Sequence, residues 1–382
     1  MIKFHHIIRS RWPLLRSEIS SLAIFALSAL LLLGMATQGS TAESGGVLRF
    51  GMRADPGSIS PRIGNNVGAA VVRNVVENLL FLDPKTGKIE PWLARSWDVE
   101  EEGSVFIFRL RDDVTFSDGT KLTADVIKKN FDQIPGLPPT ANSTKQLLTG
   151  YVGSEVIDDY TIKVKFGGPN VQFLEAVTEP RLGIISGPSV DKPVEEVMAG
   201  EYAGSGPFTI ASYEPNSMIK LVKRSGYSSH LAVDSNRGDA YLDGIDISIL
   251  PESTIRTGSL FTGQLDYAAD LPSQDAARFK NAGPDGPVLL ARSIGGITGG
   301  FFLNAREGLL TDIAVRKALM VGIDRQAVSD DIFFGIAPPA TAVLTRVTPG
   351  WTDKSAALAY DPSAAESMLE EGQRTPIQVR RD

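Results

Sequence analysis

Residues 105–120 read Val-Phe-Ile-Phe-Arg-Leu-Arg-Asp-Asp-Val-Thr-Phe-Ser-Asp-Gly-Thr, a strand pattern that runs into a turn. Apolar side chains alternate with arginines along its first half, which predicts a strand with one buried face. The apolar positions are Phe106, Phe108 and Leu110. The Ser-Asp-Gly-Thr end is typical of a tight turn. Thr123 follows where a helix needs a capping hydroxyl, so strand and helix succeed each other closely, as in a mixed α/β or α+β fold.

A second strand signal lies at residues 160–166, where apolar residues alternate with Thr161, Lys163 and Lys165. We expect this strand to pair with residues 154–157 through a turn at Asp158-Asp159. Further strands are predicted at residues 46–51, 208–213, 218–224 and 245–250. The long stretch of glycines and apolar residues at 289–304 is interpreted as a connection from one lobe to another.

Helices are predicted from capping residues and apolar periodicity. Asn65 or Asn66 can cap a helix on which apolar residues recur at a spacing of four, so a buried helical face is expected there. Those residues are Val67, Val71, Val75 and Leu79. In the second half of the chain, Thr311, Asp324 and Asp361 are the predicted helix caps. Gly372 is predicted to end the last helix.

The N-terminus has the three parts of an export signal. A basic leader contains Lys3, Arg9, Arg11 and Arg16. An apolar run at residues 22–35 follows, and the small residues Ser40 and Ala42 come after it. We expect cleavage after Ala42, which makes residues 1–42 a signal peptide. The alternative is a membrane anchor, but the run is short for a span of about 20 apolar residues. A periplasmic protein is expected.

Composition excludes several classes of function. The 382 residues are enough for two domains. The net charge of −7 makes an electrostatic nucleic-acid binder improbable. Because the chain has no cysteine, it cannot form disulfides, thiol nucleophiles, zinc-thiolate sites or iron–sulfur clusters. No cofactor and no metal site are expected.

Catalytic motifs are also missing from the sequence. His230 would be the one histidine left after cleavage of the signal peptide, and it lies in a polar stretch. A secreted Ser-His-Asp hydrolase would have to use it, and no Gly-x-Ser-x-Gly motif accompanies it. Residues 234–239 match a calcium loop only loosely. We therefore expect a binding protein without catalytic residues, with a secreted hydrolase as the less favoured alternative.

Several short boxes follow one another in a fixed order over residues 46–372. They are Pro91-Trp92-Leu93-Ala94-Arg95-Ser96-Trp97, residues 106–119, Leu122-Thr123-Ala124-Asp125-Val126, Gly204-Ser205-Gly206-Pro207-Phe208, Phe302-Leu303-Asn304, Val315-Arg316-Lys317-Ala318-Leu319, Ile323-Asp324-Arg325 and Tyr360-Asp361-Pro362. In these boxes the chain resembles the extracellular solute-binding proteins of ABC importers, family 5, the dipeptide, oligopeptide and nickel type. Six or more boxes in order make the resemblance specific.

The resemblance implies a two-lobed clamp like the type II periplasmic binding proteins. Lobe I would comprise residues 43–303 with an inserted subdomain at about 84–180, and residues 304–382 would belong to lobe II. A peptide or related small solute would bind in the cleft between the lobes, and the closed form would dock on an ABC permease of the inner membrane. A monomer is expected. Nickel is a weaker option because His230 alone cannot build a histidine site.

The chain is shorter than members of this family usually are, so the resemblance implies a truncated lobe II. Apolar faces meant for the remainder would then be exposed, which predicts poor solubility. A non-functional truncated remnant is the alternative to a working binding protein.

Candidate ligand contacts fall in three places. Asp55, Pro56 and Ser58 follow the first predicted strand, where open α/β sheets tend to bind ligands; the alternative is an ordinary turn. Arg181 could hold a carboxylate with its guanidinium, or could form a surface salt bridge.

Arg292, Gly295, Gly296 and Phe301 lie on or near the predicted lobe crossing. The two glycines could admit a ligand backbone or act as a hinge, and a plain connector is an equal alternative. For Phe301 and Phe302, a place in the core is favoured over a stacking role. Trp92 and Trp97 are expected to pack rather than bind.

Overall fold

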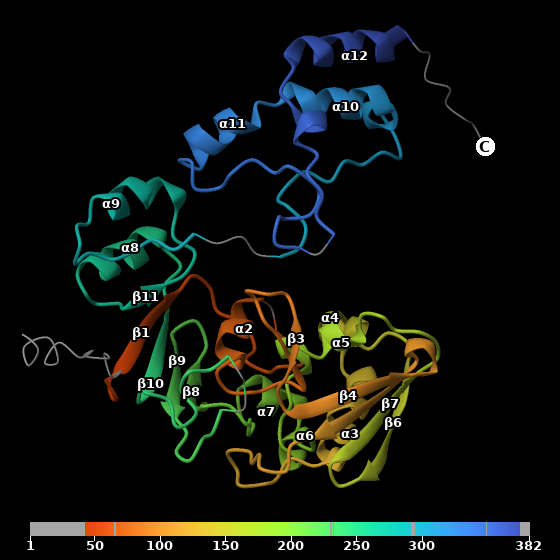
Figure 1. Cartoon of the computed structure of the whole chain (residues 1–382). Helices are drawn as coiled ribbons and strands as arrows, with labels where there is room; N and C mark the ends of the chain where they lie inside the picture. The colour runs from red at the N-terminus through yellow and green to blue at the C-terminus, as the bar shows by residue number, and fades with distance from the viewer. Residues whose placement is uncertain are drawn as a thin grey trace, which may run out of the picture. The chain divides into compact units, whose positions relative to one another are not determined.

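The computed structural model describes residues 43–64, 66–229, 231, 233–291, 295–348 and 350–374. The predicted signal peptide, His230 and Arg292 lie outside the described residues. Figure 1 labels the helices and strands. No helix within the described part of the chain is both long enough and apolar enough to cross a bilayer.

The first sheet has five strands in the order β11-β1-β10-β9-β8. Their bounds are β1 (Val47–Met52), β8 (Phe208–Glu214), β9 (Met218–Lys223), β10 (Gly244–Ile249) and β11 (Tyr267–Ala268). Strand β1 pairs in parallel with β10 and β11, whereas β9 is antiparallel to both β8 and β10. The strands predicted at 46–51, 208–213, 218–224 and 245–250 are confirmed.

The second sheet has four antiparallel strands in the order β4-β5-β7-β6. They are β4 (Ala94–Glu100), β5 (Val105–Leu110), β6 (Tyr151–Asp158) and β7 (Thr161–Phe166), and the predicted pairing of β6 with β7 is confirmed. Helix α3 (Ala124–Asp132) packs on β6 and β7, and the hydroxyl of Thr123 caps it as predicted. The buried face carries a cluster of phenylalanine rings in edge-to-face contact.

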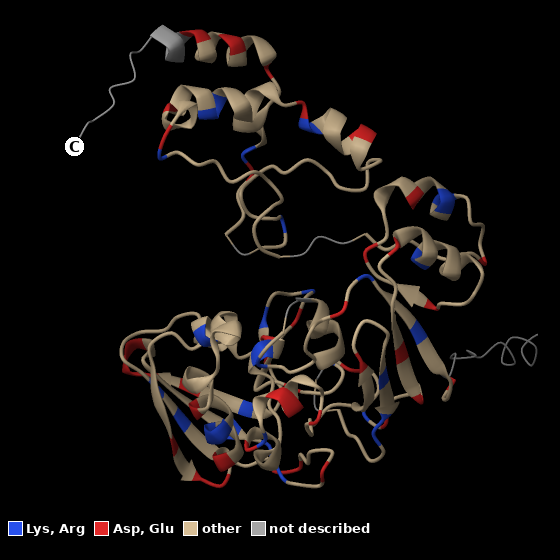
Figure 2. Ribbon diagram, turned by 180° about the vertical axis from the view of Figure 1, so that it is seen from behind, with Lys and Arg blue, Asp and Glu red and all other residues tan. Residues whose placement is uncertain are grey.

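Acidic and basic residues are interspersed along the strands of this sheet (Figure 2). Arg109 pairs with Asp98 and Lys165 with Glu155, each at 2.6 Å. The alternation that predicted these strands thus separates a core face from a solvated one.

Shorter elements complete residues 46–291. A two-stranded ribbon joins β2 (Leu80–Leu82) and β3 (Ile89–Pro91). The helices are α2 (Asn66–Val72), α4 (Asn142–Leu147), α5 (Phe173–Ala176), α6 (Gly187–Val190), α7 (Val194–Met198), α8 (Ser253–Phe261) and α9 (Ala276–Lys280). Trp92 is buried, and Trp97 packs against the phenylalanine core, so the expectation that both tryptophans pack is confirmed.

Helix α2 is shorter than the sequence predicts. It ends at Val72, so Val75 and Leu79 are buried but not helical. Beyond the helix, the carbonyls of Asn74 and Val75 accept hydrogen bonds from the amides of Phe208 and Gly206, at 3.1 and 2.9 Å. These carbonyls are satisfied by another segment instead of by the next helical turn, because the chain here runs between two cores.

The Gly-Ser-Gly-Pro-Phe box at 204–208 provides the space for this contact. A Cβ on Gly204 would lie 1.9 Å from the carbonyl oxygen of Val75, and one on Gly206 would lie 2.8 Å from it. Glycine is therefore required at both positions by close backbone approach.

Besides short 3-10 turns at Leu309–Thr311 and Ser355–Leu358, the described residues between 295 and 374 form irregular segments and three α-helices. They are α10 (Ile313–Gly322), α11 (Arg325–Ala327), which continues into a π-helical segment (Val328–Ile332), and α12 (Pro362–Arg374). The predicted caps Asp324 and Asp361 are confirmed. The cap of α10 is Asp312 rather than Thr311, because the Asp312 carboxylate reaches the amide of Ala314. The helical backbone also passes through Gly372 to Arg374, so the predicted stop is wrong.

Apolar side chains in this part of the chain are largely exposed. Phe301 and Phe302 are 90% and 96% exposed, so the prediction that they lie in a core is wrong. Within 295–348 and 350–370, the buried residues are Ala318, Ser329 and Ala365. Helices α10 and α12 pack on each other through such small residues. Apolar character alone misled the prediction, since burial also needs packing partners.

Replacing Gly204 with alanine should destabilise the protein by about 3 kcal/mol, because the new methyl group has to displace the backbone at Val75. Urea unfolding followed by circular dichroism measures the change. Gly258→Ala in α8 is the matched control, since nothing lies within 4 Å of its added Cβ. Equal unfolding midpoints for the two variants would contradict the close contact.

Candidate functional site

Strands β1, β8 and β10 run in the same direction, so their carboxyl ends lie at one edge of the five-stranded sheet. The loop at 53–64 follows β1, and the β8–β9 turn at 215–217 begins at the same edge. Ligands of open α/β sheets bind beyond the carboxyl ends of parallel strands. This edge is therefore where a binding site is expected.

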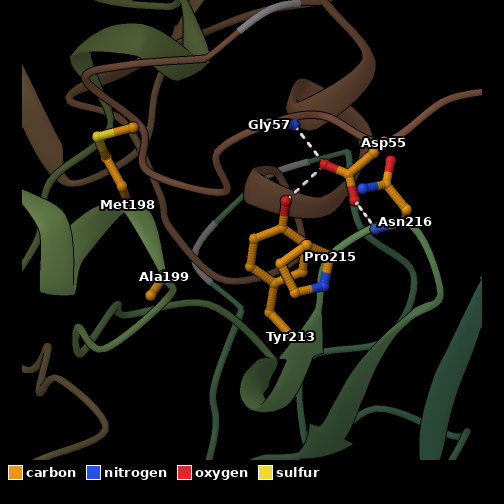
Figure 3. Close-up of a pocket in the computed structure, with 7 residues that line it drawn as sticks. All are labelled: Asp55, Gly57, Met198, Ala199, Tyr213, Pro215 and Asn216. Carbon is orange, nitrogen blue, oxygen red and sulfur yellow. Dashed lines mark hydrogen bonds between the residues drawn. The ribbon is translucent and has the colours of Figure 1, made fainter.

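Asp55 joins the two loops at this edge. Its Oδ1 accepts hydrogen bonds from the amide of Gly57 at 2.6 Å and from the hydroxyl of Tyr213 at 2.5 Å. Its Oδ2 accepts one from the amide of Asn216 at 2.5 Å. Figure 3 shows these three bonds converging on the carboxylate. The carboxylate thus holds the loop after β1 against the turn after β8.

A pocket of about 470 Å³ opens beside this carboxylate. It is lined by Asp55, Gly57, Met198, Ala199, Tyr213, Pro215 and Asn216. Figure 3 shows Met198, the last residue of α7, and Ala199 on the opposite side of the pocket from Asp55 and Asn216. The pocket combines one carboxylate and one phenol with an apolar wall.

The hydrogen bonds set the protonation states in the pocket. Partial burial opposes ionisation of Asp55, but the bonds from Tyr213, Asn216 and Gly57 outweigh it and lower the pKa of the carboxyl. Burial raises the pKa of Tyr213, and its hydrogen bond to Asp55 raises it further. At neutral pH the pocket therefore holds a carboxylate anion and a neutral phenol.

Three further candidates, Pro56, Ser58 and Arg181, make contacts within the protein and do not line the pocket. Pro56 and Ser58 are buried, and the Ser58 hydroxyl accepts a hydrogen bond from the amide of Ser60 at 3.1 Å. Arg181 lies 3.6 Å from Glu179 as a partly exposed ion pair, which is the alternative foreseen for it. The pocket contains Asp55 but none of these three residues.

The candidates of the predicted crossing lie elsewhere. Arg292 is outside the described residues. The amide of Gly296 donates to the hydroxyl of Thr348 at 2.7 Å, and a Cβ on Gly295 would meet that same hydroxyl at 3.9 Å. Phe301 is exposed. Of the described candidates, Gly295, Gly296 and Phe301 do not line the pocket beside Asp55.

Sequence reasoning missed Tyr213, Asn216, Met198 and Ala199. A signal for Asn216 existed, because Glu214-Pro215-Asn216-Ser217 separates two predicted strands and is typical of a turn. Asn216 has a φ of 59°, a left-handed conformation that asparagine tolerates in turns. No motif or spacing in the neighbouring sequence predicts that Met198 and Ala199 line a pocket.

Comparison with known proteins identifies the family. The sequence model of the bacterial extracellular solute-binding proteins, family 5 Middle, matches residues 88–376. The chain belongs to this family. The glutathione-binding protein GsiB of Salmonella paratyphi A is 26% identical over 311 residues, which is 80% of this chain and 57% of that protein. The chain thus spans a little more than half the length of the curated relatives it matches.

Solved structures share the fold of this family member. DppA of Helicobacter pylori, solved in complex with the peptide STSA, has a TM-score of 0.69 at 22% identity, covering 88% of this chain and 67% of that one. NikA of Brucella suis, solved with Fe(III)-EDTA, has a TM-score of 0.69 at 21% identity, covering 85% and 64%. The expected mixed fold of type II periplasmic binding proteins is confirmed.

Among the described residues of this family member, no group of three or more acidic or histidine side chains is arranged to hold a metal ion. A separate buried carboxyl, Glu77, lies between the two cores. Its Oε1 accepts hydrogen bonds from the indole of Trp92 at 3.2 Å and the hydroxyl of Tyr227 at 2.8 Å. Burial raises the pKa of Glu77 to about 7, although these bonds and the nearby Arg224 charge act in the opposite direction.

Glu77 should make stability fall as pH rises. Folding raises the pKa of Glu77 from 4.5 to about 7. The contribution of Glu77 to the free energy of unfolding is therefore complete below pH 4.5 and is lost as the pH rises through about 7. The loss above pH 8 is about 3 kcal/mol. Glu77→Gln keeps the accepting oxygen without the charge, so this variant should equal the parent at pH 4.5 and exceed it at pH 8.

Urea unfolding at the two pH values measures this difference. Glu155→Gln is the matched control, because the hydrogen bond from Lys165 lowers the pKa of Glu155, a shift opposite in direction to that of Glu77. Parallel stability–pH curves for the parent and Glu77→Gln would show that Glu77 does not titrate in this range.

Proposed function

We propose that this chain is the substrate-binding component of an ABC importer, which captures a peptide or related small solute and delivers it to a permease of the inner membrane. The observation that carries the proposal is the family match over residues 88–376. The pocket at the carboxyl edge of the first sheet supports it, since it offers an anion and an apolar wall without a catalytic constellation. Binding without covalent change is the activity proposed.

The relatives indicate the class of solute. The curated relatives are named as glutathione-binding proteins, and DppA was solved with a four-residue peptide. Glutathione is itself a modified tripeptide, so both point to short peptides. Residues 1–42 are proposed to act as a signal peptide cleaved after Ala42, which would place the protein in the periplasm.

We propose that residues 43–303 form lobe I, with an inserted subdomain at about 84–180, and that residues 304–382 belong to lobe II. The separate core of the four-stranded sheet supports the subdomain. Ligand would then stabilise the closed arrangement of the lobes by contacting both. Asp55 is the proposed contact from lobe I, while Arg181, Arg292, Gly295, Gly296 and Phe301 stay predictions.

Binding is tested by differential scanning fluorimetry and calorimetry with glutathione and the tetrapeptide Ser-Thr-Ser-Ala. A solute at about 100 times its Kd should add roughly 2.7 kcal/mol of stability, which corresponds to a rise in Tm of several degrees. The absence of any shift or heat with either solute would contradict the proposed function.

Filling the pocket with a larger side chain should weaken the binding of the solute. Ala199 lines the pocket and is exposed, so Ala199→Phe can enter the cavity without disturbing a core. We expect it to weaken binding at least tenfold at unchanged Tm of the free protein. Val171→Phe is the matched control, because Val171 is 90% exposed and does not line the pocket.

A further inference from the structure

Residues 299–303 read Gly-Gly-Phe-Phe-Leu and lie outside every helix and strand. We propose that this stretch is a processing site for a serine endopeptidase that takes an aromatic side chain into its S1 pocket. Cleavage after Phe301 or Phe302 separates the chain that precedes the cut from the residues up to 382. The inference concerns a covalent modification of the chain and goes beyond the proposed function.

The two phenylalanine side chains of this stretch are the first support. Phe301 is 90% exposed and Phe302 is 96% exposed. Among the residues that the structure describes, the next most exposed aromatic side chain is that of Tyr360, at 51%. Because the S1 pocket of such a protease has to enclose one side chain, these two phenylalanines are the aromatic residues it can reach with least rearrangement.

The backbone of the stretch is also open to a partner. No hydrogen bond joins residues 299–303 to any other residue in the described part of the chain. On one side, the amide of Thr298 donates to the carbonyl of Val343 at 2.8 Å. On the other, the amide of Arg306 donates to Oδ1 of Asn304 at 3.1 Å. Peptides that bind as an added strand use their main-chain groups in this way, so the stretch can pair with an enzyme without unfolding.

Gly299 and Gly300 allow the backbone to adapt to the enzyme. A Cβ added at either glycine would have no other atom within 4 Å, so the space around both is open. Glycine also reaches backbone conformations that other residues avoid. The stretch can therefore become extended in a protease cleft without displacing a packed group.

The reaction consumes one water molecule and needs no other co-reactant. For a cut after Phe302, the serine of the enzyme attacks the carbonyl carbon of Phe302. The bond from that carbon to the nitrogen of Leu303 breaks, and the leaving amine takes a proton from the histidine of the enzyme. Water then releases the acyl group from the serine, which leaves a carboxylate on Phe302 and an amine on Leu303.

The two products differ in how much core they keep. Both clusters of buried hydrophobic residues lie between Phe50 and Ile249, and the residues that line the pocket in Figure 3 also precede the cut. Beyond the cut, within 303–348 and 350–370, the buried residues are Ala318, Ser329 and Ala365. The product before the cut therefore persists, whereas the product after it is degraded further, because it has little apolar burial to keep it folded.

Limited digestion of the full chain with chymotrypsin, followed by intact-mass spectrometry, tests the site. We expect the first cut within the described residues to fall after Phe301 or Phe302, and the product that ends there to persist. A first cut after Tyr360, or after any other described residue, would overturn the inference. Disappearance of both products at the same rate would overturn it as well.

A double variant provides an independent test. Phe301→Ser combined with Phe302→Ser should slow cleavage in this stretch by roughly tenfold or more, because the S1 pocket loses its aromatic side chain. Phe333→Ser combined with Phe334→Ser is the matched control. It alters another adjacent pair, which is 42% and 47% exposed and follows a π-helical segment.

The control should change the rate of cleavage at residues 299–303 by less than about twofold, since its own pair lies next to hydrogen-bonded backbone. An equal effect of the two double variants would contradict the inference. Circular dichroism checks that both variants fold. If either does not, the position of the first cut in the unaltered chain decides.

Discussion

A close backbone contact between two segments far apart in the sequence joins the two hydrophobic cores of this protein. The amides of Gly206 and Phe208 donate to the carbonyls of Val75 and Asn74, and a side chain at Gly204 would collide with the same carbonyl of Val75. The first segment leaves helix α2, and the second begins strand β8. After this contact the chain continues into β2 and the core of the four-stranded sheet. The contact thus joins the two cores through main-chain atoms, which tolerate little displacement.

The loop after β1 supports the pocket through a separate set of contacts. The loop after β1 is buried from Ser58 to Ile63, and its amide at Ile59 donates to the carbonyl of Met198. The Tyr202 hydroxyl donates to the carbonyl of Ile59, and the buried guanidinium of Arg62 donates to the carbonyls of Arg181 and Gly183. Both walls of the pocket are therefore attached to one rigid loop. The lining of the pocket is therefore held in place by contacts within the protein.

Local signals in the sequence predicted much of this fold and little of the pocket. Patterns along the sequence identified strands β1, β5, β6, β7, β8, β9 and β10, but not β2, β3, β4 or β11. The caps at Thr123, Asp324 and Asp361 were correct because a cap depends on neighbours within about three residues. The length of α2 was wrong, since Val75 and Leu79 are buried between two cores instead of on a helix face. The prediction that Phe301 and Phe302 lie in a core was wrong for a related reason, because apolar residues are buried only where other elements cover them.

The sequence by itself determined the family and many of the strands and helices, because short motifs and patterns of a few residues carry both kinds of information. It also pointed to the loop of Asp55, through the rule that ligands bind beyond the carboxyl ends of strands. Only the tertiary structure decided that Asp55 lines a pocket while Pro56 and Ser58 do not, and that Tyr213 and Asn216 are its partners. Tyr213 and Asn216 lie about 160 residues from Asp55 in the sequence. No local pattern carries information over that separation, and only the packing of the sheet brings these groups together.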